Sequence, residues 1–212
     1  MDGVIADTAP YHLTAWREVF QERGVKFTEE DFRHSFGLRN DTIIRNILGE
    51  ETSQNEIELI SCDKEANFRR KIGQNLRLLP GVINLITSLK EHGVKVALAS
   101  SAPMENIQLL TRGLGIDNYF QTIISGKDVA EGKPSPQAFL LAARKMGVEP
   151  PNCIVIEDAI AGITAAKRVE MRCLAITSTH PRESLGEADL IVDSLEEVTV
   201  NDLEMLINPH KV

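Results

Sequence analysis

The stretch CIVIEDAIAG at residues 153–162 joins a short apolar run to a polar turn and the start of a helical pattern. Residues 153–156 are apolar at every position, which is typical of a strand covered on both faces in a parallel sheet. Glu157 and Asp158 follow where such a strand would end, and residues 159–168 show helical spacing. This order indicates an α/β protein with polar groups at the carboxyl ends of its strands.

The same alternation runs through residues 79–212. Further apolar runs of strand length lie at residues 94–99, 122–124, 173–176 and 190–192. Helical patterns separate these runs, at residues 81–91, 104–113, 136–146, 159–168 and 195–207. The alternation predicts a Rossmann-like parallel sheet with helices on both faces.

Residues 7–78 follow another pattern, with helical spacing and few β-branched runs. Helices are predicted near residues 9–23, 28–35, 41–48 and 53–73. Thr28 with Asp31, and Ser53 with Glu56, have the spacing of capping boxes at two of these helix starts. We therefore predict an α/β core of residues 1–6 and 79–212, with residues 7–78 inserted as a helical cap. The chain must cross between the two parts twice, at neighbouring points, which would suit a hinge.

Composition narrows the functional classes. The net charge of −8 argues against binding to nucleic acid or to an anionic membrane, because both need a basic surface. The sequence has no apolar run of the roughly 20 residues that span a bilayer. Cys62, Cys153 and Cys173 form no C-x-x-C pair, and the last two open apolar runs, so we expect buried free thiols in a reducing cytoplasm. We expect a monomer.

Polar residues follow several predicted strands and should gather at one edge of the sheet. They are Asp2, Ser100, Ser101, Asp128, Lys133, Glu157 and Asp158. Clustered carboxylates repel one another, and a hard cation such as Mg²⁺ relieves that repulsion. A lysine and a hydroxyl add contacts for phosphate. Together these residues predict phosphoryl transfer with a small phosphorylated metabolite as substrate. Positioning and charge neutralisation supply most of the catalysis in such reactions.

Four motifs in order resemble the haloacid dehalogenase-like superfamily, and within it the β-phosphoglucomutase and sugar-phosphatase branch. They are DGVIADT at residues 2–8, LASS at 98–101, GKPSP at 132–136 and VIEDAIAG at 155–162. The resemblance covers essentially the whole chain. It implies that Asp2 is the general acid and base, that Ser100 and Lys133 bind phosphate, and that Glu157 and Asp158 serve magnesium together with the backbone carbonyl of Asp2.

The resemblance also implies an aspartate nucleophile two residues before Asp2, at the end of a central first strand. Met1 immediately precedes Asp2. We therefore expect the nucleophile and its strand to lie upstream of this chain. A chain that lacked them would bind magnesium weakly and would turn over no phosphomonoester at a normal rate.

Cap residues distinguish two activities within this branch. His12 and Trp16 match positions that line the substrate face, and Arg39, Asn40, Ser101 and Asn106 complete the expected substrate-binding set. The mutase cap resembles K-G-x-S-R, whereas this chain has Phe36 and Asn40 at the two cationic positions. This favours hydrolysis of a sugar phosphate over the alternative, a β-phosphoglucomutase-type mutase. A second alternative, a catalytically silent binding protein, rests on the missing nucleophile.

Less specific readings of these residues remain open from sequence alone. Glu157 and Asp158 would also suit the start of the helix that follows them. Trp16 would equally suit the interior of the cap, and Asn106 faces either the site or a helix surface. The other histidines show no metal-ligand spacing and are expected to be solvated: His34, His92, His180 and His210.

Overall fold

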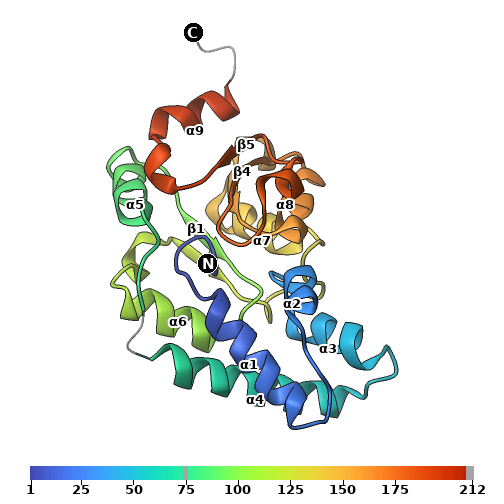
Figure 1. Cartoon of the computed structure of the whole chain (residues 1–212). Helices are drawn as coiled ribbons and strands as arrows, with labels where there is room; N and C mark the ends of the chain where they lie inside the picture. The colour runs from blue at the N-terminus through green and yellow to red at the C-terminus, as the bar shows by residue number, and fades with distance from the viewer. Residues whose placement is uncertain (74–75, 209–212) are drawn as a thin grey trace.

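The computed structural model describes residues 1–73 and 76–208. Four helices follow the N-terminal segment and lie together at the bottom of Figure 1: α1 (Ala9–Gln21), α2 (Glu29–Ser35), α3 (Asn40–Leu48) and α4 (Gln54–Ile72). Thr28 and Asp31 form the predicted capping box of α2. At α4 only half of the predicted box is present, in which the Ser53 hydroxyl accepts from the Glu56 amide at 3.3 Å.

Helical periodicity places one apolar stripe of each helix against the others. Trp16 and Phe20 of α1 stack at a centroid distance of 5.4 Å and pack with Ile44 and Ile60. Ile57, Ile60 and Phe68 form the inner stripe of α4, whereas Ala66 is exposed. Lys64 is buried there instead, between Ile60 and Phe68 in sequence.

The remaining residues form a parallel sheet in two parts. The strands are β1 (Ala97–Ala99), β2 (Thr122–Ile124), β3 (Ile154–Glu157), β4 (Arg172–Ile176) and β5 (Leu190–Val192). β1 pairs with β2, and the other three pair in the order β3-β4-β5, all in parallel. The predicted strand at 94–99 begins later, because the Val94 amide still donates to the Leu89 carbonyl at 2.9 Å and completes the preceding helix.

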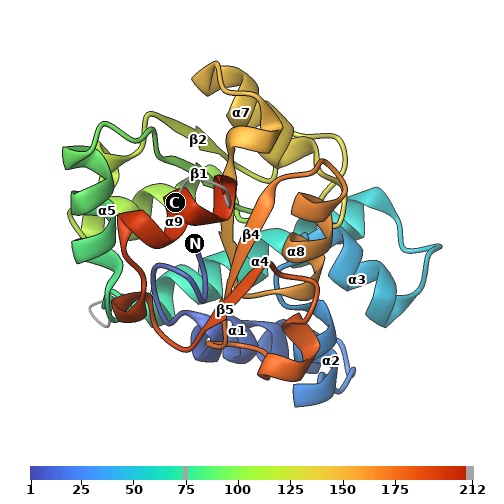
Figure 2. The ribbon, with the colours of Figure 1, turned by 90° about the horizontal axis from the view of Figure 1, so that it is seen from above.

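Helices cover the sheet as the alternation predicts (Figures 1 and 2). They are α5 (Val82–Glu91), α6 (Met104–Gly113), α7 (Gln137–Met146), α8 (Ile160–Lys167) and α9 (Val200–Ile207). The predicted helix at 195–207 is divided, because Thr199 and Asp202 form a capping box that starts α9 after a 3₁₀ turn. The architecture is α/β with a parallel sheet. Among the described residues, no helix is both long and apolar enough to cross a membrane.

An apolar cavity of about 370 Å³ separates the two parts of the sheet. Ala97, Leu98 and Ala99 of β1 line it from one side, and the backbone run 154–156 of β3 lines it from the other. Within the described residues, β1 pairs only with β2, and β3 pairs only with β4. Both strands therefore present an unpaired edge to the cavity, a costly arrangement for buried N–H and C=O groups.

The chain passes between the sheet and helices α1–α4 at two adjacent points. Ala6 and Leu78 form an antiparallel bridge, and the Leu79 amide donates to the Ile5 carbonyl at 2.9 Å. The paired crossings place the start of α1 directly beside the carboxyl ends of the strands.

Candidate active site

A polar pocket of about 70 Å³ lies between the carboxyl ends of the strands and helices α1–α4. Every predicted site residue except Arg39 and Asn106 lines it. The core side contributes Asp2, Ser100, Ser101, Lys133, Glu157 and Asp158, and the helical side contributes His12, Trp16 and Asn40. The sheet thus brings together residues that are up to 156 positions apart in sequence, from Asp2 to Asp158.

Lys133 and Glu157 form a buried ion pair on the floor of the pocket. Their side chains are 9% and 7% exposed, so little water screens the pair. Lys133 lies on the loop after β2, and Glu157 ends β3. Ser100 follows β1, and its hydroxyl accepts from the Ala102 amide at 3.1 Å. Lys133, Ser100 and Ala102 therefore line one pocket and offer it a cation, a hydroxyl and a backbone amide, the groups that bind phosphate.

Asp158 is the most strongly perturbed carboxyl group in the pocket. Burial, and secondly the charge of Glu157, raise the pKa of Asp158 to about 7. The Thr179 hydroxyl donates to its Oδ2 at 2.7 Å, which partly opposes the shift. Gly3 packs so closely against Asp158 that a Cβ there would collide with the carboxylate, and Gly3 has a φ of +67°. The N-terminal turn and Asp158 are therefore fitted to each other.

Asp2, Glu157 and Asp158 together have the chemistry of a site for a hard divalent cation. Carboxylate oxygens are preferred ligands of Mg²⁺, and a cation would remove the penalty that raises the pKa of Asp158. Across residues 1–73 and 76–208, however, no three His, Cys, Asp or Glu side chains are grouped closely enough to hold a metal. The polar partners explain this, because Asp2 contacts Thr8 and His12 while Glu157 contacts Lys133.

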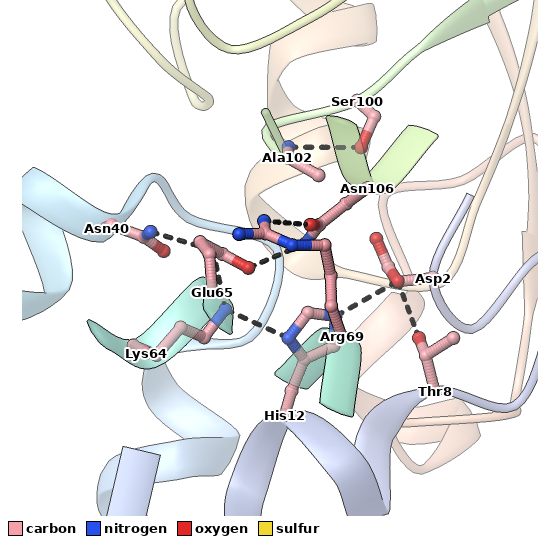
Figure 3. Close-up of polar contacts among 10 residues, drawn as sticks. All are labelled: Asp2, Thr8, His12, Asn40, Lys64, Glu65, Arg69, Ser100, Ala102 and Asn106. Atoms are coloured by element: carbon pink, nitrogen blue, oxygen red, sulfur yellow. Dashed lines mark hydrogen bonds and ion pairs between the residues drawn. The ribbon is translucent and has the colours of Figure 1, made fainter. Parts of the chain in front are cut away.

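Two residues from the start of the helical part orient Asp2 (Figure 3). The Thr8 hydroxyl donates to Asp2 Oδ1 at 2.6 Å, and His12 Nε2 lies 3.1 Å from the same oxygen. Burial raises the pKa of Asp2, but the hydrogen bonds that its carboxylate accepts from His12 and Thr8 lower it, and the net pKa lies below the ordinary value. Lys64 Nζ lies 2.9 Å from His12 Nδ1. Because an ammonium group only donates, Nδ1 accepts and Nε2–H donates to Asp2.

Lys64 and Glu65 of α4 also line the pocket, and sequence reasoning missed both. Lys64 Nζ and Asn40 Nδ2 each lie 2.8 Å from Glu65 Oε1, and Asn106 Nδ2 lies 2.6 Å from Oε2 (Figure 3). Asn106 is fully buried behind Glu65, where it also accepts from Arg69 at 2.9 Å. A signal existed, because Lys64 continues the apolar spacing of Ile57 and Ile60, and a charged residue on such a stripe needs a buried partner.

Arg39 does not reach the pocket. Its guanidinium group pairs with Asp41 at 2.8 Å, and Nη1 donates to the carbonyls of Val129 and Ala130 at 3.1 and 3.0 Å. The bidentate pair with Asp41 and the two carbonyls use the planar fork of the side chain. Arg39 therefore ties the helical part to the loop that precedes Lys133.

His180, expected to be solvated, is buried with 8% exposure. Its Nδ1 lies 3.0 Å from the Asp158 carbonyl, and its Nε2 lies 3.1 Å from the Arg33 carbonyl, so it bridges the core and α2. His34 and His92 are exposed, as expected, and His210 lies outside the described residues. Asp128 caps its own loop by accepting from the Ser125 amide at 2.7 Å.

The α/β fold and the pocket at the strand ends agree with what sequence comparison shows, a hydrolase family. The chain belongs to the haloacid dehalogenase-like hydrolase family, whose profile matches residues 1–170. It is 33% identical to the β-phosphoglucomutase of Bacillus subtilis, over 94% of this chain and 89% of that protein. It is 29% identical to hexitol phosphatase B of Escherichia coli, over 96% and 93% of the two chains.

Among solved structures, a β-phosphoglucomutase from Clostridium difficile aligns with a TM-score of 0.89 at 29% identity, over 99% of this chain and 95% of that one. The protein is accordingly a phosphatase-type hydrolase, and its relatives include a β-phosphoglucomutase and a hexitol phosphatase. Relatives of both kinds, mutase and phosphatase, match at similar identity.

Proposed function

We propose that this protein hydrolyses a sugar or polyol monophosphate and releases inorganic phosphate, with Mg²⁺ as cofactor. The observation that carries the proposal is the charge of the pocket wall on the helical side. Among the described residues of that wall, Lys64 is the basic residue besides His12, and Glu65 neutralises it at 2.8 Å. A mutase must grip a second phosphate there, and such a grip needs cations.

In this proposal the transferred phosphate binds at the core end of the pocket. Lys133 supplies a positive charge, and Ser100 with the amides that follow β1 supplies hydrogen bonds. Magnesium would be held by Asp158 and Asp2, with Glu157 nearby, and would offset the negative charge of the phosphate oxygens. Thr8 and His12 hold Asp2 as the acid and base that exchanges a proton with the leaving oxygen and then with water.

The attacking carboxylate is proposed to come from a strand outside residues 1–212 that occupies the cavity between β1 and β3. The cavity is apolar, is about 370 Å³ in volume and borders two unpaired strand edges in the described part of the chain. A parallel strand there would end beside Asp2. Its carboxylate would form a bond to phosphorus while the ester P–O bond breaks, and Asp2, carrying a proton in the complex with substrate, would give that proton to the leaving alkoxide. Water would then displace the carboxylate, giving its proton to Asp2.

We further propose that residues 7–78 act as a cap that closes on the core formed by residues 1–6 and 79–212. The adjacent crossings at Ala6 and Leu78 support a hinge, and closure would exclude bulk water from the pocket. A monomer in the cytoplasm remains our expectation. The unpaired thiols of Cys62, Cys153 and Cys173 support a reducing setting.

The alternative is a phosphosugar mutase, which the 33% identity to a β-phosphoglucomutase favours. Phosphorus NMR during turnover separates the two activities. With glucose 1-phosphate, Mg²⁺ and protein that carries the proposed strand, we expect inorganic phosphate to accumulate faster than the 6-phosphate, because no cationic grip lets a bisphosphate reorient and rebind. Dominant conversion to the 6-phosphate would establish the mutase, and no turnover of any phosphate ester would favour a silent binding protein.

A further inference from the structure

Glu65 is a buried carboxylate in the wall of the pocket opposite the phosphate end. It is 6% exposed and lines the same cavity as Lys133 and Asp158. Three side chains from two helices of the cap and one helix of the core donate to it: Lys64, Asn40 and Asn106. A buried charge held by so many partners is costly to build and fixes one geometry.

The hydrogen bonds of Glu65 leave one acceptor position. A carboxylate offers about four lone-pair sites, two on each oxygen. Oε1 accepts from Lys64 and Asn40, and Oε2 accepts only from Asn106 in the described structure. Oε2 can therefore accept one more hydrogen bond from a donor in the pocket, such as a hydroxyl group.

The charge of Glu65 has a second consequence. Burial raises the pKa of Glu65, but the charge of Lys64 and the hydrogen bonds from Lys64 and Asn40 lower it by more, so the net pKa lies below the ordinary value and the carboxylate stays ionised near neutral pH. Beside it the wall is apolar, formed by Trp16, Phe36 and Ile43. A second phosphate or a carboxylate placed against Oε2 would meet a carboxylate oxygen and no cation of the described residues, because the Lys64 ammonium that pairs with Glu65 lies against Oε1.

We propose that Glu65 is a specificity-determining residue that accepts a hydrogen bond from a hydroxyl of the leaving group and rejects leaving groups with a second negative charge. The inference rests on the proposed function and narrows its substrate class to monophosphates of neutral polyhydroxylated compounds. Asn40 and Asn106 act through Glu65, as positioning residues. The CH face of the same leaving group would pack on the apolar wall.

The test compares Glu65→Gln with the unsubstituted protein in calorimetric titrations containing Mg²⁺, and both carry the proposed strand with asparagine in place of its nucleophile, so that neither hydrolyses the ligand. The ligands are glucose 6-phosphate, glucose 1,6-bisphosphate and inorganic phosphate. Glutamine keeps the size of the side chain but removes its charge. We expect the preference for the monophosphate over the bisphosphate, as a ratio of Kd values, to fall by about 10-fold to 100-fold. Affinity for inorganic phosphate should change little, because that ligand occupies only the core end.

Two further variants serve as controls for this comparison. Glu65→Asp keeps the negative charge but places the carboxylate one methylene group further from the ligand. Rejection of the bisphosphate should therefore persist while affinity for the monophosphate falls. Glu58→Gln changes an exposed carboxylate of the same helix and should alter neither. Inorganic phosphate could bind normally to Glu65→Gln while the ratio of the two Kd values stays within about twofold of wild type, a change smaller than the loss of one charge contact produces. In that case the role of Glu65 is wrong while the proposed function stands. If wild-type protein binds none of the three ligands, the proposed function fails and this inference fails with it.

Discussion

A short apolar strand ending in Phe-Asp, joined ahead of Met1, is expected to raise both the melting temperature and the rate of phosphate release. The strand would pair with β1 and β3 and fill a cavity of about 370 Å³. Cavity filling and the pairing of buried backbone groups are each stabilising. A gain of several kcal/mol would raise Tm by roughly 10 °C in a domain of this size. A supplied nucleophile should raise the rate by about 10⁴-fold or more.

A matched chain that ends the added strand in Phe-Asn separates the two effects. It should gain the same stability, because asparagine fills the same space, but it should not gain turnover. Calorimetric melting and a phosphate-release assay on the three chains give the comparison. Full activity in the chain that begins at Met1, with its mass confirmed, would contradict the proposed nucleophile. An added strand that changes neither Tm nor rate would show that the cavity does not accept it.

Asp2→Asn is expected to lower kcat by about 10²-fold to 10⁴-fold, the usual contribution of a general acid and base. Asparagine can still accept a hydrogen bond from Thr8 or His12, so the pocket should keep its shape. The affinity for inorganic phosphate should therefore change much less than kcat. Steady-state phosphate release on the strand-carrying protein measures the first quantity, and calorimetry measures the second.

Asp7→Asn is the matched control, because Asp7 is exposed and lies five positions further along the same segment. It should retain wild-type kcat. An Asp2→Asn variant with kcat near that of wild type would exclude Asp2 as the acid and base.

Sequence alone predicted the alternation of the core because each strand is a compact apolar run between helical patterns. The stretch 153–162 illustrates this, since β3, its two carboxylates and α8 lie within two residues of their expected bounds. The placement of Ser100, Lys133 and Asp158 in one pocket follows from the rule that parallel strands end at one edge. The order and direction of the strands are enough to bring these three residues into the same pocket.

The helical side was harder to predict because tertiary contacts decide it. Arg39 has a motif position that suggests substrate binding, yet Asp41 and two loop carbonyls hold it away from the pocket. His180 has no local signal, since its partners are the carbonyls of Asp158 and Arg33. Lys64 was detectable only as a charge on an apolar stripe, and spacing cannot show that Glu65 beside it neutralises it.

We propose that this pocket hydrolyses a phosphomonoester with the help of a divalent cation. The most direct measurement is the release of inorganic phosphate from glucose 6-phosphate by the strand-carrying protein, followed while Mg²⁺ is removed with a chelator and then restored. We predict steady release with Mg²⁺, a fall to background on chelation and full recovery on restoration, because the acids of the pocket need a cation beside phosphate. Release that continues unchanged after chelation, or no release under any of these conditions, would contradict the account.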